Sequence, residues 1–112
     1  MSDEILISID DVKKLRIVVG LIKEAGLHPN ADKLFVLKVD VGMEVRQVVA
    51  GIRRSYAPEQ LVGKRVVLIA NLQPAVIRGV ESQGMILAAS DDAGVSVLSP
   101  DRVDMALGSI VK

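Results

Sequence analysis

The chain has 112 residues, half of them apolar, which is room for one domain with one core and excludes a disordered tail. It contains no cysteine and a single histidine, which exclude disulfides and thiolate sites and argue against any all-protein metal site, so we expect no metal and no cofactor. The net charge is zero, but residues 1–11 carry −4, residues 12–90 carry +6 and residues 91–112 carry −2, so a basic body between acidic ends could present a positive face or simply an ordinary charged surface.

Short aliphatic runs separated by turn residues predict a β-rich chain with five main strands. In chain order these strands cover residues 16–24, 34–41, 45–51, 64–70 and 84–89. Gly20 suggests a bend or bulge inside the first strand, and Gly42 turns the chain between the second and the third. We expect the last of the five to be buried and to be followed by a turn over residues 91–94, a short strand over 95–98 and a final pairing over 110–112.

Two short helices are expected in addition to the strands. Ser8, with Asp11 three residues later, can cap a helix near the N-terminus. Pro58 can begin a single helical turn that Gly63 ends. The remaining connections are a loop over residues 25–32 and an irregular or hairpin segment over residues 71–82.

Five strands with a short helix between the third and the fourth are the plan of an OB-fold barrel, and a small SH3-like barrel is the competing architecture. We predict an all-β, five-stranded OB-fold barrel with short N- and C-terminal extensions, a single domain over residues 1–112.

Catalytic signatures are missing from the sequence. Gly63-Lys64-Arg65 lacks the Ser or Thr and the upstream glycine of a phosphate-binding loop. His28 lies beside Pro29 in a loop without a nucleophile elbow, so we expect it to anchor the loop by hydrogen bonding rather than to act as a base. The chain is therefore predicted to be a binding module and not an enzyme.

Membrane and secretory signals are missing too. The aliphatic run Ile17–Ile22 is far shorter than the roughly 20 residues that span a bilayer. The acidic start lacks the basic flank and apolar block of a secretory signal. We expect a soluble cytoplasmic protein that binds no membrane.

The loop over residues 28–34 is the first candidate binding segment. Lys33 could reach a phosphate there, and Asn30 could donate and accept hydrogen bonds to a sugar or base edge, although both residues also suit a plain turn. Arg53 and Arg54 follow the third strand and could bind phosphates bidentately or form solvated surface charge.

The polar segment over residues 81–85 is the second candidate, because it runs directly into a strand. Ser82 and Gln83 can bond to a ligand and Met85 offers an adaptable apolar surface, or the segment is a tight turn with Met85 in the core. Phe35 and Tyr56 are the only aromatic residues, so the chain has no platform for stacking single-stranded bases. If it binds RNA, it should read the backbone and shape of a folded RNA.

Six motifs in this order resemble the tRNA-binding domain family, which includes the C-terminal domain of many methionyl-tRNA synthetases and small stand-alone tRNA-binding proteins. The motifs are His28–Leu34, Val39-Asp40-Val41-Gly42, Val49-Ala50-Gly51-Ile52, Leu61-Val62-Gly63-Lys64, Asn71-Leu72 with Pro74, and Glu81–Met85. The family-like region covers residues 7–98, approximately. Arg16 and Val18 depart from it, since the family usually has an acid and an Arg there, and Ala50 stands where a Ser is frequent.

The resemblance implies an OB fold, structure-specific tRNA binding and homodimerisation through the terminal segments, with tRNA and a methionyl-tRNA synthetase as partners. It implies RNA-binding roles for Asn30, Lys33, Ser82, Gln83 and Met85, with Asn71 in support. Arg53 and Arg78 join this set on charge alone.

The chain could act as a free protein or as the appended domain of a synthetase. The alternative is a small export-related, peptide-binding chaperone, because such a group shares the fold and resembles the same motifs. A chaperone would use an apolar groove instead of a basic face.

Overall fold

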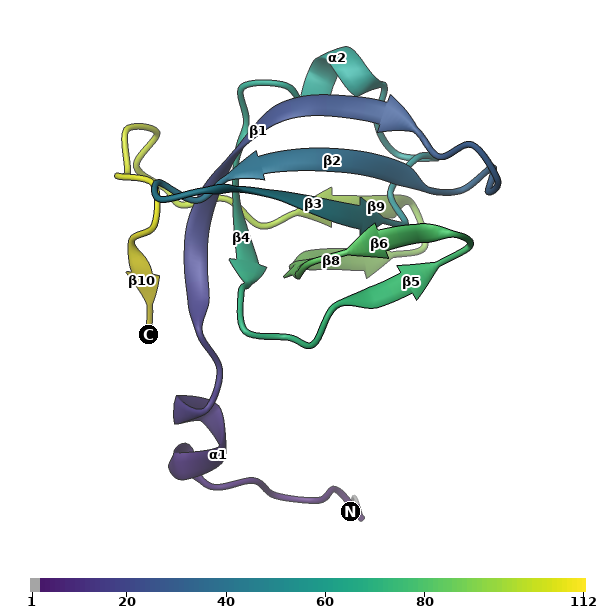
Figure 1. Cartoon of the computed structure of the whole chain (residues 1–112). Coiled ribbons are helices and arrows are strands. Elements are labelled where there is room, and N and C mark those ends of the chain that lie inside the picture. Colours follow the sequence, from purple (N-terminus) through teal and green to yellow (C-terminus); the bar gives the residue numbers. More distant parts are fainter. Residues whose placement is uncertain (1–2) are drawn as a thin grey trace.

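A computed structural model describes residues 3–112, so the first two residues of the predicted domain lie outside the described part. One antiparallel sheet forms the body of the molecule and curls into a nearly closed barrel (Figure 1). Its strands are β1 (Ile17–Leu27), β2 (Phe35–Asp40), β3 (Val45–Ala50), β4 (Arg65–Ile69), β7 (Met85–Ile86) and β10 (Ile110–Val111). The order is β3-β2-β1-β4-β7, and β10 pairs with the start of β1. The predicted five-stranded barrel is confirmed, and so is the short helix α2 (Pro58–Leu61) between β3 and β4.

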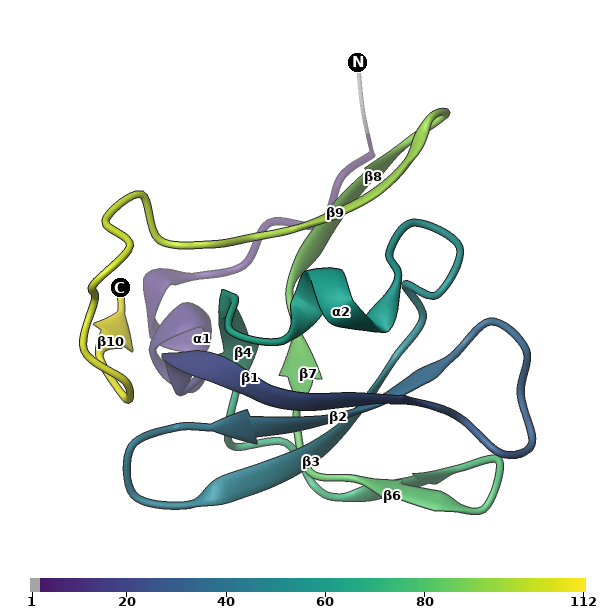
Figure 2. The ribbon, with the colours of Figure 1, turned by 90° about the horizontal axis from the view of Figure 1, so that it is seen from above.

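Two small hairpins stand beside this sheet. β5 (Ala75–Ile77) pairs with β6 (Val80–Ser82), and β8 (Ala88–Asp91) pairs with β9 (Gly94–Val97). The first hairpin lies in the segment over residues 71–82, for which the sequence predicts an irregular or hairpin structure. Figure 2 shows α2 lying over one open end of the barrel.

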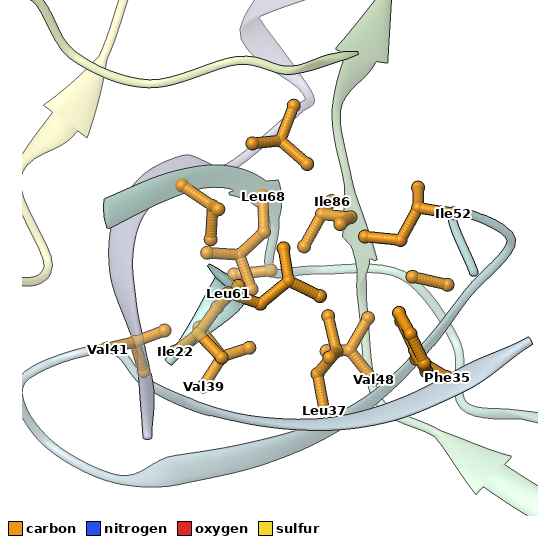
Figure 3. Packing of buried hydrophobic residues seen from close by; sticks show 14 of the residues in the cluster. Ile22, Phe35, Leu37, Val39, Val41, Val48, Ile52, Leu61, Leu68 and Ile86 are labelled. Carbon is orange, nitrogen blue, oxygen red and sulfur yellow. The ribbon is translucent and has the colours of Figure 1, made fainter. Parts of the chain in front are cut away.

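The core fills the barrel because apolar residues alternate along its strands. Phe35, Leu37 and Val39 of β2 are buried, while the residues between them are only half-buried. Leu61 of α2 is fully buried within this cluster (Figure 3). This alternation fixes the register of β2, since a shift by one residue would turn its apolar side chains outward.

The first strand differs from the prediction in two respects. Residues 25–27, expected to begin a loop, continue β1 and pair with β2. The register between these strands shifts between Ile22 and Glu24, so the bulge lies there and not at Gly20. Gly20 has a packing role instead, because a Cβ at this position would lie 2.5 Å from Cγ1 of Val39.

The prediction of one buried strand over residues 84–89 is wrong. Only Met85–Ile86 forms a strand beside β4, followed by one hydrogen bond from Leu87 N–H to the Val67 carbonyl at 2.8 Å. The next residues leave the barrel wall to form β8, all of which is exposed. The sequence Ala-Ala-Ser-Asp of β8 offers little apolar surface to bury, which explains why pairing with β9 replaces packing on the core.

The N-terminal helix α1 (Ile9–Lys13) forms as predicted and projects away from the barrel (Figure 1). Its capping box is complete, because Asp11 N–H donates to Ser8 Oγ at 3.3 Å and Ser8 N–H donates to Asp11 Oδ2 at 3.3 Å. None of its residues is buried. Within residues 3–112, neither helix has the length or the apolar run that crossing a bilayer requires.

Candidate nucleic-acid interface

The loop between β1 and β2 meets the tip of the β5–β6 hairpin at one end of the barrel (Figures 1 and 2). Two hydrogen bonds clasp them together. Asn30 Nδ2 donates to the Arg78 carbonyl at 3.1 Å, and Arg78 Nη2 donates to the Asn30 carbonyl at 3.1 Å. The structure therefore brings together two predicted site residues that are 48 positions apart in the sequence.

His28 lies beneath this clasp and is buried, with 4% of its surface exposed. Its Nε2 is 2.9 Å from the Ile77 carbonyl, and its Nδ1 accepts a hydrogen bond from the Asn30 backbone N–H at 2.9 Å. The expectation that His28 anchors its loop is confirmed by these contacts. Both of its partners are backbone groups, one on the loop and one on the hairpin.

The positive side chains gather around the same clasp. Lys33 and Arg78 line one surface hollow of about 460 Å³ together with Ala31, Asp32 and Leu34. Both cations are exposed. Because Asp32 contributes the only negative charge to this lining, its net charge is positive and favours an anion.

Arg53 is hydrogen-bonded to the backbone of the loop between β1 and β2. Its backbone N–H donates to the Lys33 carbonyl at 3.4 Å, and its Nη1 donates to the Ala31 carbonyl at 3.5 Å. The half-buried Arg53 guanidinium adds positive potential near the hollow, and its contacts order the backbone that carries Lys33.

Arg78 itself occupies an unusual backbone position at the hairpin tip. Its φ is +54°, and Gly79 follows with a φ of +89°. Arg78 and Gly79 form the two-residue turn between the paired residues Ile77 and Val80, and a turn of this kind requires a positive φ at both positions. The turn therefore sets the Arg78 backbone, and the clasp with Asn30 holds its side chain against the loop.

Ser82 and Gln83 occupy a different place, in the seam that closes the barrel between β3 and the chain after β6. Ser82 is buried, and its Oγ accepts from Val49 N–H at 3.0 Å and donates to the Gly84 carbonyl at 3.1 Å. Gln83 N–H donates to the Gln47 carbonyl at 2.7 Å, and its Oε1 accepts from Gln47 N–H at 2.9 Å. Both side chains accept hydrogen bonds from backbone N–H groups along the edge of β3, so they already have partners within the protein.

Sequence reasoning missed the residues of β3 and β2 that complete this seam. Gln47 Oε1 accepts from Lys38 Nζ at 2.6 Å, and its Nε2 donates to the Glu81 carbonyl at 2.8 Å. Arg46 Nη1 donates to the carbonyls of Ala70 and Gln83. The signal was present in the sequence, since an Arg-Gln pair interrupts the otherwise apolar strand over residues 45–51.

Met85 lies half-exposed at a second hollow and not in the core. This hollow, of about 290 Å³, is walled by the end of β3 and the start of β8. Its lining consists of Val49, Ala50, Gly51, Ile52, Met85, Ile86, Ala88, Ser90 and Val95. It adjoins the basic hollow, because a Cβ on Gly51 would be only 3.6 Å from Leu34 Cδ2.

Asn71 and Arg54 lie apart from the basic hollow. Asn71 Oδ1 accepts from Arg16 N–H at 2.7 Å and its Nδ2 donates to the Lys14 carbonyl at 2.7 Å, so it fastens the segment between α1 and β1 to the end of β4. Arg54 lines a third hollow beside the β8–β9 hairpin. Among the described residues, no three His, Cys, Asp or Glu side chains come together in a way that could hold a metal ion.

Comparison with known proteins agrees with this geometry. The family model described as "Putative tRNA binding domain" matches residues 17–109. The methionine–tRNA ligase of Thermococcus kodakarensis is 53% identical over 106 residues, which cover 95% of this chain and 14% of the ligase, so the chain spans only a small part of that relative.

Two solved structures share the whole fold. A protein from Pyrococcus horikoshii described as related to MetRS superposes with a TM-score of 0.89 and 35% identity, covering 97% of this chain and 100% of its own. The CsaA chaperone protein from Picrophilus torridus superposes with a TM-score of 0.89 and 28% identity, covering 96% and 100%. A family model that matches most of the chain, together with these relatives, shows that the chain belongs to the tRNA-binding domain family.

Proposed function

We propose that the chain is a tRNA-binding module that performs no catalysis itself and recognises the phosphate backbone and shape of folded tRNA. The observation that carries the proposal is the convergence of Lys33 and Arg78 on one hollow, with Arg53 beneath them. Lys and Arg side chains on a rigid barrel end bind phosphates without reading bases, which positions the protein on the RNA but confers no sequence preference.

The two aromatic side chains support recognition of the backbone instead of stacking. Phe35 is fully buried in the core. Tyr56 packs against the core, and its hydroxyl accepts from Val97 N–H at 3.0 Å. Neither ring is free to stack on a base, so RNA binding depends on contacts with phosphates and on the shape of the folded RNA.

The site that we propose consists of Asn30, Lys33, Arg53 and Arg78, with Met85 at its apolar margin. Ser82, Gln83 and Asn71 hold the surrounding elements in place. A direct test compares several tRNA species with single-stranded RNA of the same length in gel-shift titrations. The proposal expects similar affinities for all tRNAs and weaker binding of the single strand. Equal or tighter binding of the single strand contradicts it.

A second candidate function, capture of an extended apolar peptide, is favoured by the half-exposed Met85 over its apolar hollow and by the likeness to a chaperone. Salt separates the two candidates. Binding of tRNA should collapse at high salt, whereas apolar binding should persist. A peptide complex that survives high salt and is displaced by Met85→Asp would support the chaperone function.

We propose in addition that the protein is a homodimer joined through its terminal segments. The N-terminal arm exposes a run of large apolar side chains, among them Leu6 at 85% and Ile9 at 66% exposure, and β10 exposes Ile110. Figures 1 and 2 place α1 and β10 on the same side of the barrel. Burying such a surface against a second copy would remove it from water.

Light scattering coupled to gel filtration tests the dimer. Leu6→Asp with Ile9→Asp should give a monomer, because neither residue packs on the barrel of its own chain. Val62→Asp, at an exposed apolar residue after α2, is the matched control and should stay dimeric. A monomeric unmodified protein contradicts the proposal.

The similarity to a methionine–tRNA ligase further supports a partnership with a methionyl-tRNA synthetase in the cytoplasm. The chain would act either as an appended domain of the synthetase or as a free protein in trans. Added in trans, the chain should lower the KM for tRNA of a methionine–tRNA ligase that lacks such a domain. An unchanged KM contradicts the partnership.

A further inference from the structure

We infer that His28 is the positioning residue of the tRNA site: its neutral ring, with the proton on Nε2, holds the loop and the hairpin in the arrangement that directs Lys33 and Arg78 toward one hollow. The inference rests on the proposed function. His28 is not among the residues that line the hollow, so its effect on RNA would be exerted through the residues that it holds.

The partners of the ring determine which nitrogen carries the proton. The Ile77 carbonyl can only accept, so Nε2 must donate to it across their 2.9 Å separation. The Asn30 backbone N–H can only donate, so Nδ1 must be unprotonated to accept it. One neutral tautomer satisfies both contacts, and a doubly protonated ring satisfies only one.

The two contacts of His28 lie next to the two ends of the clasp. Ile77 immediately precedes Arg78, and the N–H that binds Nδ1 belongs to Asn30, the residue that clasps Arg78. The base of the hairpin is held to β3 by other groups, through Glu81 and Ser82. At the hairpin tip, by contrast, Arg78 is bonded to the loop through the clasp, and the preceding Ile77 is bonded to it through the histidine.

Two substitutions separate the roles of the ring. His28→Gln keeps an amide N–H that can donate to the Ile77 carbonyl and an amide oxygen that can accept from the Asn30 N–H. His28→Phe keeps the bulk of the ring but leaves the Asn30 N–H and the Ile77 carbonyl without their partner. Neither changes the net charge of the protein at pH 8, so a change in the salt dependence of binding cannot come from lost charge.

The experiment measures tRNA affinity at pH 8.0 and several salt concentrations, with thermal unfolding of each variant as the check on folding. We expect His28→Gln to bind within about threefold of the unmodified protein, because its amide can replace both contacts of the ring. At pH 8.0 His28→Phe should bind about tenfold more weakly, and its slope of log K against log salt should fall by about 0.9, the value of one lost phosphate contact.

Each alternative outcome has a definite meaning. A folded His28→Gln that loses as much affinity as His28→Phe overturns the inference while leaving tRNA binding intact. A folded His28→Phe with unchanged affinity and slope does the same. Failure of the unmodified protein to bind tRNA overturns the proposed function and the inference together.

Discussion

Ser82→Ala is predicted to weaken the fold and not the affinity for RNA. The residue lies in a motif that the family resemblance assigns to RNA binding, but its hydroxyl accepts from Val49 N–H at 3.0 Å and donates to the Gly84 carbonyl at 3.1 Å. Because the side chain is buried, alanine leaves the Val49 N–H inside the barrel with no partner. The side-chain hydrogen bond that joins β6 to β3 at this point is lost.

The magnitude follows from the unpaired donor. A buried polar group that loses its partner costs about 1–3 kcal/mol, and the lost methylene-sized volume is negligible beside it. We therefore expect the free energy of unfolding to fall by about 2 kcal/mol. For a domain of this size that corresponds to a melting temperature lower by about 8 °C.

The assay combines thermal unfolding with tRNA titration well below the melting temperature. Ser90→Ala, at an exposed serine of β8, is the matched control and should change the free energy of unfolding by less than about 0.5 kcal/mol. Ser82→Ala should bind tRNA within a factor of about two of the unmodified protein. If instead it melts normally and binds at least tenfold more weakly, Ser82 contacts the RNA and our assignment of the seam is incorrect.

Two further predictions test the packing of β1 and the N-terminal helix. Gly20→Ala should destabilise the barrel by about 1–3 kcal/mol in denaturant unfolding, because the added Cβ would lie 2.5 Å from Val39 Cγ1; unchanged stability would show that the wall at this point can yield. The Ser8 backbone N–H, together with Lys14, holds the pKa of Asp11 below its ordinary value of 3.8. The helix stabilisation that this carboxylate provides is therefore present above that value and is lost as the pH falls through the lowered pKa. The NMR shift of the Asp11 carboxyl and the hydrogen exchange of the α1 amides should report this loss together. Amide exchange that does not change with this titration would refute the link.

Local patterns predicted most of the barrel. The alternation of Phe35, Leu37 and Val39 identified β2 and its inward face, and the Ser8–Asp11 spacing identified α1. Such features depend on neighbours within a few positions. The bulge near Lys23 was misplaced to Gly20, because a glycine within a strand serves a bulge and a close packing contact equally well, and only the position of Val39 decides between them.

The candidate site was harder to predict because long-range partners define it. Lys33 and Arg78 were chosen by motif and by charge, and the structure brings them to one hollow. Ser82 and Gln83 are polar residues ahead of a strand, which is the pattern of a ligand contact as much as of a seam. What distinguishes these roles is the free edge of β3, more than 30 residues earlier, which the sequence alone does not place beside them.

The salt dependence of tRNA binding by the double variant Lys33→Ala/Arg78→Ala tests the central claim most directly. If both side chains neutralise phosphates from one hollow, the slope of log K against log salt should fall by about 1.5 relative to the unmodified protein. Arg102→Gln/Lys112→Gln removes the same charge from the C-terminal segment and should leave the slope unchanged. Figure 1 shows that segment across the barrel from the loop between β1 and β2. A double variant whose slope matches that of the unmodified protein, or a control that loses as much, would contradict a phosphate site at the meeting of the loop and the hairpin.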